Sequence, residues 1–106
     1  MLESVYQARL IKKLGRLFPG CVVLKNDTDY QQGIPDLIIL FENKWAMLEV
    51  KASFDSVSQP NQEYFVELFD HMSFGAFICP ENEREVLHDL QQTFGTRRPS
   101  RVSQRQ

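Results

Sequence analysis

The fold of this chain follows from two neighbouring stretches, GIPDLIIL at residues 33–40 and WAMLEVK at residues 45–51. Both are rich in branched and aromatic residues, which favour strands. The polar segment at residues 42–44, ENK, separates them and favours a tight turn. The two stretches are therefore predicted to be adjacent strands of a hairpin.

Charged side chains occur in both predicted strands, where a buried strand should carry none. Because side chains alternate along a strand, Trp45, Met47, Glu49 and Lys51 share one face. Asp36 opens the partner strand, directly after a proline. A hairpin that turns at residues 42–44 brings Asp36 and Glu49 to the same end of the sheet. Both carboxylates could then bind one hard cation, with Lys51 beside them.

The segments Pro35-Asp36 and Glu49-Val50-Lys51 resemble the signature of the PD-(D/E)XK nuclease superfamily. The chain is most similar to the small stand-alone VRR-NUC and Holliday-junction-resolvase-like members, from about residue 3 to about residue 79. Glu-x-Lys alone arises often by chance, so the resemblance depends on the Gly-x-Pro-Asp motif upstream and on the apolar flanks. It implies an α/β fold with a restriction-endonuclease-like core, in the order αβββαβα, whose central mixed sheet is flanked by helices.

Length and composition predict one globular domain. The chain has 106 residues, of which 42% are hydrophobic and 25% are charged. No apolar run has the length of a membrane span, and no apolar signal core occurs near the N-terminus. Cys21 and Cys79 are isolated, so we expect both to be reduced in a cytoplasmic protein, in the host cytoplasm if the chain is virus-encoded. We predict a single nuclease domain at residues 1–95 and a flexible basic tail at residues 96–106.

The distribution of charge is more informative than the net charge of −2. The predicted first helix holds four basic residues against one acid, and the tail has arginines without acids. Clustered basic residues are typical of contacts with nucleic-acid phosphates. We predict DNA contacts for Lys12 and Arg16 in the helix and for the tail residues Arg97, Arg98, Arg101 and Arg105.

Residues 2–18 are predicted to form that first helix. At 100° per residue, one apolar stripe contains Leu2, Tyr6, Leu10, Leu14 and Leu17. Glu3 falls inside this stripe. It could belong to a frayed first turn, where an acid favours the helix dipole. Alternatively, it could be a third carboxylate of the metal site, which the resemblance implies because related nucleases often supply such a glutamate from their first helix.

A strand is predicted at residues 21–25, and three further elements are predicted after the hairpin. Ser58 is a good N-cap and Pro60 a good early residue for a helix that ends near Met72. Residues 73–79 are predicted to form a strand, and residues 81–94 a surface helix. The apolar stripe of the middle helix should contain Phe65, Leu68, Phe69 and Met72.

Three further residues have a functional and a structural interpretation. Lys25 could contact the DNA backbone or be an exposed strand lysine. Gly33 could permit close approach of a phosphate or only serve a turn. Gln62 could be an ordinary boundary residue of its helix. The run at residues 58–62 also resembles the Ser-x-x-Gln segment of VRR-NUC proteins, which implies a position near the catalytic lysine and the bound phosphate.

The predicted site has the chemistry of phosphodiester hydrolysis. Asp36, Glu49 and the Val50 carbonyl would bind Mg²⁺, or Mn²⁺ in its place, and Glu3 could complete a second metal position. Lys51 would orient the attacking water or stabilise charge on the phosphate. The alternative for the three charged strand residues is a salt bridge at a strand end.

We therefore expect a metal-dependent DNA endonuclease that acts on branched DNA as a homodimer. Three alternatives stay open: a nuclease subunit of a restriction or recombination complex, a non-catalytic DNA-binding module of the same fold, and an RNA-directed nuclease. The dimer interface is predicted on helices. The options are the first helix, through Leu2 and Tyr6, and the helix at residues 63–72; exchange of the first helix would place Glu3 in the partner's site.

Overall fold

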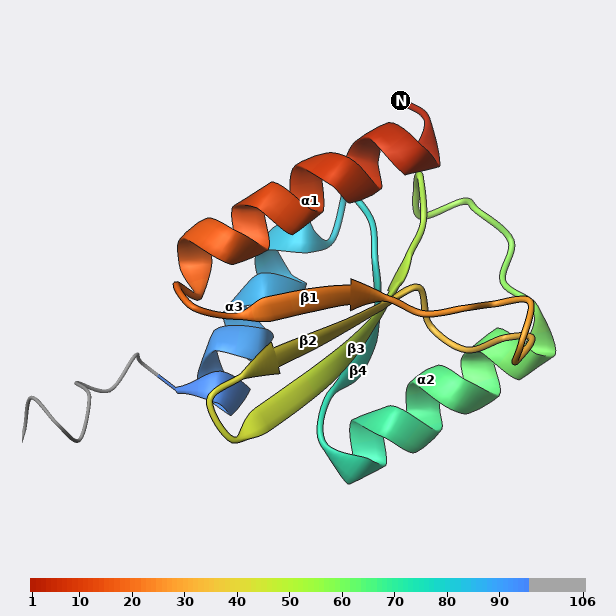
Figure 1. Ribbon diagram of the computed structural model, residues 1–106. Helices are drawn as coiled ribbons and strands as arrows, with labels where there is room; N and C mark the ends of the chain where they lie inside the picture. Colours follow the sequence, from red (N-terminus) through yellow and green to blue (C-terminus); the bar gives the residue numbers. More distant parts are fainter. Residues whose placement is uncertain (96–106) are drawn as a thin grey trace, which may run out of the picture.

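A computed structural model describes residues 1–95 of the chain. Three helices and one four-stranded sheet follow in the order helix, three strands, helix, strand, helix (Figure 1). The expected α/β class, with a mixed sheet flanked by helices, is confirmed. The elements are α1 (Glu3–Leu17), β1 (Val22–Lys25), β2 (Leu37–Phe41), β3 (Lys44–Val50), α2 (Pro60–Met72), β4 (Gly75–Ile78) and α3 (Glu83–Phe94).

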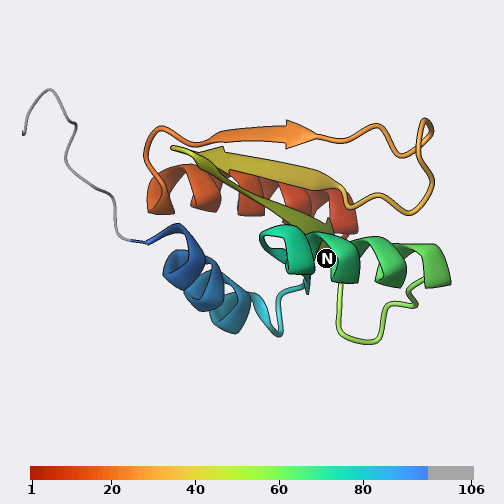
Figure 2. The same cartoon turned by 90° about the horizontal axis from the view of Figure 1, so that it is seen from below.

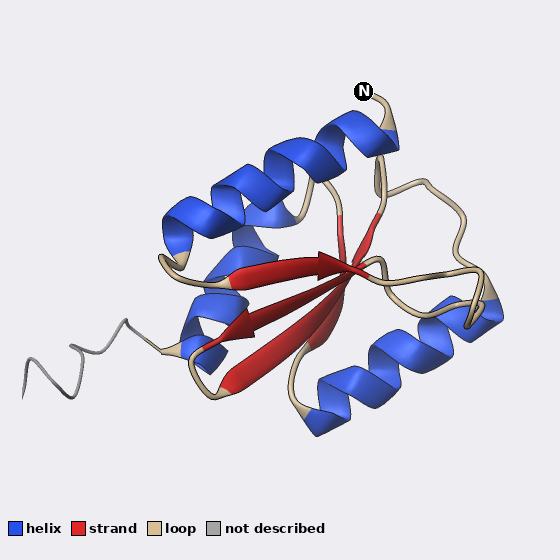
Figure 3. Ribbon diagram, viewed as in Figure 1, coloured by secondary structure: helices blue, strands red, loops and turns tan. Residues whose placement is uncertain are grey.

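The strands lie in the sheet in chain order. Figure 3 shows the strands in red, with the helices around them in blue. The pairs β1–β2 and β2–β3 are antiparallel, and β3–β4 is parallel because α2 connects these two strands. The predicted hairpin has a two-residue turn, Glu42-Asn43, and Glu42 adopts a positive φ of 56°. Leu37 lies opposite Leu48 in this hairpin. The residues before Leu37 and after Leu48 are therefore neighbours at one end of the sheet.

One side of the sheet is closed by α1 and α3, and the other carries α2 (Figures 1 and 2). On the closed side, alternate strand residues such as Ile39 and Leu48 are fully buried against Leu10 and Leu14 of α1 and Leu90 of α3. The rings of Phe18, Phe41 and Phe94 meet at its far end. This side is the hydrophobic core of the domain.

The packing of α2 differs from the sequence prediction in two respects. Its N-cap is Gln59 rather than Ser58. Of its apolar residues only Val66 is buried, whereas Leu68 and Met72, which we predicted in the buried stripe, are exposed. The reason is that α2 packs closely on β4 at Gly75, where a Cβ atom would overlap the Val66 carbonyl oxygen. This contact turns the other apolar flank of α2 away from β4.

The start of α1 also differs from its predicted stripe. Tyr6, Leu10 and Leu14 are buried as expected, but Leu2 is 72% exposed and Glu3 is exposed too. Leu2 is the N-cap of α1, so only the residues from the second turn onward cover the sheet. Glu3 therefore does not lie inside a buried apolar stripe.

Candidate active site

Asp36 and Glu49 meet at the end of the β2–β3 hairpin, as the register requires. Asp36 precedes the Leu37–Leu48 pair, and Glu49 follows it. The backbone N–H of Val50 donates a hydrogen bond of 2.9 Å to Oδ2 of Asp36. This bond ties the start of β2 to the end of β3 and orients the Asp36 carboxylate toward the site.

Glu49 is the one polar or charged residue among residues 1–95 that is buried, with 3% of its surface exposed. Its Oε1 atom has no hydrogen-bond partner in this part of the chain. Burial and the neighbouring charge of Asp36 raise the pKa of Glu49 to about 7, against the opposing effect of Lys51. Burial also raises the pKa of Asp36, although the Val50 amide and Lys51 partly offset this. A buried carboxylate oxygen without a hydrogen-bond partner is costly, and Oε1 of Glu49 is such an atom.

Gln62 connects Glu49 to Lys51. Its Nε2 donates a 3.0 Å hydrogen bond to Oε2 of Glu49, and its Oε1 accepts a 3.0 Å bond from Nζ of Lys51. Nζ of Lys51 also donates to the Val57 carbonyl at 3.2 Å and lies 3.7 Å from Oε2 of Glu49. The three side chains come from β3, from the residue after it and from the first turn of α2. They form one connected polar cluster.

The first turn of α2 explains why Gln62 points into this cluster. Gln59 is the N-cap and Pro60 the first helical residue, a favourable combination for starting a helix. The Gln59 N–H donates to Oε1 of Gln62 in a capping box, and this is the same oxygen that accepts from Lys51. The helix start and the lysine are therefore positioned by one side-chain atom.

The donor atoms at this end of the sheet fit a hard cation. Asp36 and Glu49 provide two adjacent carboxylates, and one oxygen of Glu49 is buried and unpaired. Oxygen atoms of this kind are the ligands that Mg²⁺ and Mn²⁺ prefer. Among residues 1–95, no group of three or more His, Cys, Asp or Glu side chains is close enough to hold a metal ion. The protein side chains of this site are therefore a pair of carboxylates.

Glu3 lies outside this pair but influences it. It is exposed, and within residues 1–95 it makes no hydrogen bond or ion pair to the cluster. Its charge nevertheless contributes to the raised pKa of Glu49, so the first turn of α1 lies near the end of the sheet that carries the site, although α1 packs on the opposite side of the sheet. The fold thus brings Glu3 near the carboxylates without joining it to them.

Lys25 and Gly33 flank the site on its β2 side. Lys25 ends β1, is exposed and pairs with Leu37, the residue after Asp36. Gly33 has a φ of 87°, and a Cβ atom there would come within 2.7 Å of the Asn61 side chain. The glycine therefore permits the loop before β2 to contact the first turn of α2, which explains the residue by packing.

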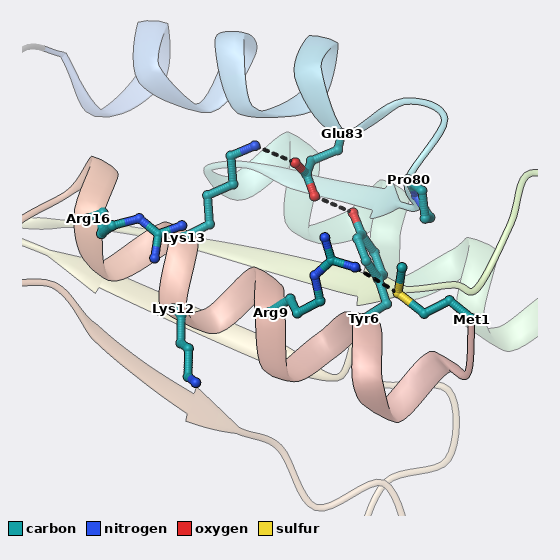
Figure 4. A pocket seen from close by; sticks show the side chains of 8 residues that line it. All are labelled: Met1, Tyr6, Arg9, Lys12, Lys13, Arg16, Pro80 and Glu83. Carbon is teal, nitrogen blue, oxygen red and sulfur yellow. Dashed lines mark hydrogen bonds and ion pairs between the residues drawn. The ribbon is translucent and has the colours of Figure 1, made fainter.

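A basic groove lies between α1 and the start of α3 (Figure 4), and neither Asp36 nor Glu49 lines it. Its cavity of about 400 Å³ is lined by Met1, Tyr6, Arg9, Lys12, Lys13, Arg16, Pro80 and Glu83. Glu83 accepts hydrogen bonds from Lys13 at 2.6 Å and from Tyr6 at 2.8 Å. Burial opposes ionisation of Glu83, but these two bonds and the positive charges of Lys13 and Arg9 together lower its pKa. Glu83 thereby neutralises Lys13 and leaves the other three basic residues in excess.

The predicted DNA contacts Lys12 and Arg16 belong to this groove. Both are exposed, and Lys12 points away from Glu83 in Figure 4. The tail residues Arg97, Arg98, Arg101 and Arg105 lie outside the described residues. Sequence reasoning missed Tyr6 and Glu83 as polar partners, because no sequence signal links residues 77 positions apart.

A second hollow, of about 220 Å³, adjoins Lys51. It lies between the loop after β3 and the end of β4, and Ser53, Ser56, Phe77 and Asn82 contribute to its lining. The sequence predicts only a connecting loop at residues 52–57. Its composition contains no motif that would have marked a cavity.

Comparisons with models of protein families, with curated proteins and with solved structures found no match to this chain. Among the described residues, no helix combines the length and the apolar character that crossing a membrane requires.

Proposed function

We propose that this protein is a metal-dependent DNA endonuclease with a restriction-endonuclease-like core, of the PD-(D/E)XK type. The observation that carries the proposal is the cluster at the end of the hairpin. Two carboxylates, Asp36 and Glu49, adjoin a lysine that Gln62 holds in place. The buried, unpaired oxygen of Glu49 is difficult to explain as a structural salt bridge, because Lys51 reaches the other oxygen and only at 3.7 Å.

Asp36, Glu49 and the Val50 carbonyl would hold the Mg²⁺ ion, with Mn²⁺ as a substitute. When bound, the ion polarises the phosphate and lowers the pKa of a coordinated water molecule. Glu3 would take part if the first turn of α1 moves toward the pair. Burial raises the pKa of Glu49, and a cation bound in the site would lower it again, because the cation favours the ionised carboxylate.

Lys51 has a defined task in this proposal. Its ammonium group has three N–H donors, of which two are used by Val57 and Gln62. The third donor is available to the attacking water or to a non-bridging phosphate oxygen. Gln62 is a positioning residue, since it holds Lys51 and Glu49 in a fixed relation before substrate arrives.

The basic groove between α1 and α3 would bind DNA phosphates through Lys12 and Arg16, together with Lys25, the backbone at Gly33 and the tail arginines. Branched DNA is the proposed substrate, cut by a homodimer because one site cuts one strand and resolving a branch requires two cuts. The contacts between these basic residues and DNA phosphates would contribute salt-dependent binding affinity and take no part in the cleavage step.

The direct test is to incubate the purified protein with Mg²⁺ and a panel of four-way, flapped, single-stranded and linear duplex DNA. We expect cleavage of branched substrates with Mg²⁺ or Mn²⁺, no cleavage in excess chelator, and inhibition by Ca²⁺, which tolerates looser geometry and activates water poorly. Cleavage that persists undiminished in chelator would reject the proposal. RNA versions of the same substrates, added as competitors, distinguish an RNA-directed nuclease.

The alternatives predict different results in the same assay. A non-catalytic module of this fold would bind the DNA panel without cleaving any member. A nuclease subunit of a larger complex would cleave with Mg²⁺ but without preference among DNA structures, since its specificity would come from a partner.

A further inference from the structure

The α2 side of the sheet carries a large apolar face that α2 covers only in part. The helix packs on β3 and β4, while β1 and β2 extend beyond it (Figure 2). Strand register shows which side chains share this face: Val22 lies opposite Leu40, and Leu40 opposite Trp45. The floor of the face therefore consists of Val22, Leu24, Ile38, Leu40 and Trp45.

One flank of α2 forms the wall of this face. Phe69 packs edge-on against Trp45 with ring centroids 6.0 Å apart, and Phe65 stacks on Phe69 at 5.9 Å. Leu68 and Met72 continue the same flank by helical spacing. We call these nine residues the open apolar face: Val22, Leu24, Ile38, Leu40, Trp45, Phe65, Leu68, Phe69 and Met72.

Much of this face is exposed to solvent. Val22 is 49% exposed, Leu24 50% and Met72 62%. Leu40 and Leu68 are also exposed, and the other four residues are half-buried. Together the nine side chains leave roughly 600 Å² of apolar surface in water, on the order of 70 Å² each. This is at the upper end of the ~300–600 Å² that the largest patch on a monomer typically reaches.

We propose that the open apolar face is the interface of a homodimer, in which it packs against the same face of a second copy. Two such faces would bury ~1,200 Å² of apolar surface, and polar residues at the rim would add to an area that already reaches the range of stable interfaces. A two-fold interface must be complementary to itself. An uncharged apolar face satisfies this requirement, whereas the basic groove on α1 would repel its own copy.

Charge also favours a second copy over DNA on this face. None of its nine residues is charged, so it offers no partner for phosphates. The polar cluster around Glu49 lies at the end of the same side of the sheet, beyond Met47, and stays outside the apolar area. The proposal refines the homodimer of the proposed function but depends on neither DNA nor metal.

The structure also changes the predicted interface on α1. Tyr6 is 4% exposed and bonded to Glu83, so it is not available to a partner. Leu2 remains exposed at the N-cap. The helix at residues 63–72 remains part of the proposed dimer interface. The uncovered parts of β1 and β2 form the rest of that interface.

Val22→Glu is the decisive variant, and Val5→Glu is its matched control. Both valines are about half exposed, at 49% and 47%, but Val5 lies on α1 outside the open apolar face. We expect light scattering at tens of micromolar to show a dimer for the wild type and for Val5→Glu, and a monomer for Val22→Glu. Leu68→Glu, on the α2 flank of the same face, should also give a monomer. Circular dichroism establishes that each variant is folded.

Trp45 provides a second readout without mutation, because it is the only tryptophan of the chain and belongs to the face. Dilution through the dissociation constant should shift its emission to longer wavelength in the wild type, with no concentration dependence in Val22→Glu. A wild-type monomer at all concentrations would overturn the proposal, as would a folded Val22→Glu dimer. A dimer broken by Leu2→Glu but not by Val22→Glu would place the interface on α1. Because none of these measurements uses DNA or Mg²⁺, they can fail while the nuclease proposal stands.

Discussion

The two sides of the sheet are built from the same strands but differ in how completely they are covered. Ile39 and Leu40 are neighbours in β2; Ile39 is fully buried under α1 and α3, whereas Leu40 is 37% exposed. The closed side contains the core, and the basic groove lies on its outer surface between α1 and α3. The α2 side contains the buried carboxylate, the lysine and the open apolar face. The hydrophobic core and the candidate site thus lie on opposite sides of one sheet.

This difference has a physical basis in the position of α2. One helix is too narrow to cover four strands, and close packing at Gly75 fixes it over β3 and β4. The end of β3 then lies under the first turn of the helix, where Gln62 can reach Glu49. Partial coverage therefore creates both the enclosed polar cluster and the exposed apolar surface.

The largest expected effect comes from the chemistry of the α2 side. Asp36→Asn, Glu49→Gln and Lys51→Ala should each slow cleavage of a branched substrate roughly a thousandfold, a loss of about 4 kcal/mol of transition-state stabilisation. Single-turnover rates with Mg²⁺ measure this, with circular dichroism to establish folding. Asp89→Asn, an exposed carboxylate on α3, is the control that should cleave normally. Full activity in any of the three would remove that residue from the mechanism.

The second prediction compares the two neighbours in β2. Ile39→Ala should lower the free energy of unfolding by about 2–5 kcal/mol, because it leaves a cavity in a closed core. Leu40→Ala should cost less than about 1 kcal/mol in the monomer, since its side chain is already partly in water. Urea denaturation monitored through Trp45 gives both values, and a Leu68→Glu background keeps the comparison within the monomer without changing the strand partner of Leu40. Equal losses for the two variants would contradict the division into a closed and an open side.

The third prediction concerns the dependence of stability on pH in metal-free protein. An unfolded glutamate ionises near pH 4.5, but Glu49 in the fold ionises only near pH 7. Below pH 4.5 both states are protonated and there is no penalty; between these values the unfolded state loses its proton first, so stability falls as pH rises. Above pH 7 the loss should be on the order of 3 kcal/mol.

Glu49→Gln isolates this contribution, because the amide does not titrate. Urea denaturation in chelator at pH 5.5 and pH 8 should show a smaller decline for Glu49→Gln than for the wild type. Mg²⁺ added at pH 8 should restore stability to the wild type and have less effect on the variant. An identical decline in both proteins would show that Glu49 is not the titrating group.

The smallest expected effect belongs to the outer surface of the closed side. Replacing Lys12 and Arg16 by alanine should weaken DNA binding about tenfold and flatten its dependence on salt by up to about two units of log–log slope. The single-turnover rate at saturating protein should change little. Arg84→Ala on α3, an exposed arginine that does not line the groove, serves as the control. An unchanged salt slope in the double variant would remove this groove from DNA binding.

The sequence by itself determined the hairpin and the meeting of Asp36 with Glu49. Strand alternation acts over short distances, so it specifies which side chains share a face. The exact register was decided by the structure, because the turn is Glu42-Asn43 rather than the predicted segment 42–44, and Lys44 belongs to β3 and pairs with Phe41. The cluster of basic residues on α1 and the boundaries of most elements could also be predicted, because both depend on residues that are close together in the sequence. The buried side of α2 could not be predicted. Helical periodicity shows where the apolar stripe lies, but it does not show how much of that stripe the sheet covers.

Only the tertiary structure decided which of the polar residues act together. Gln62 reaches Glu49 and Lys51 because the loop after β3 returns α2 across the end of the sheet, and Glu83 reaches Tyr6 and Lys13 because α1 and α3 pack side by side. Glu3, placed by periodicity in a buried stripe, is exposed because α1 extends past the sheet. These contacts join residues distant in sequence, and their geometry depends on how whole elements pack, which no local pattern of residues encodes.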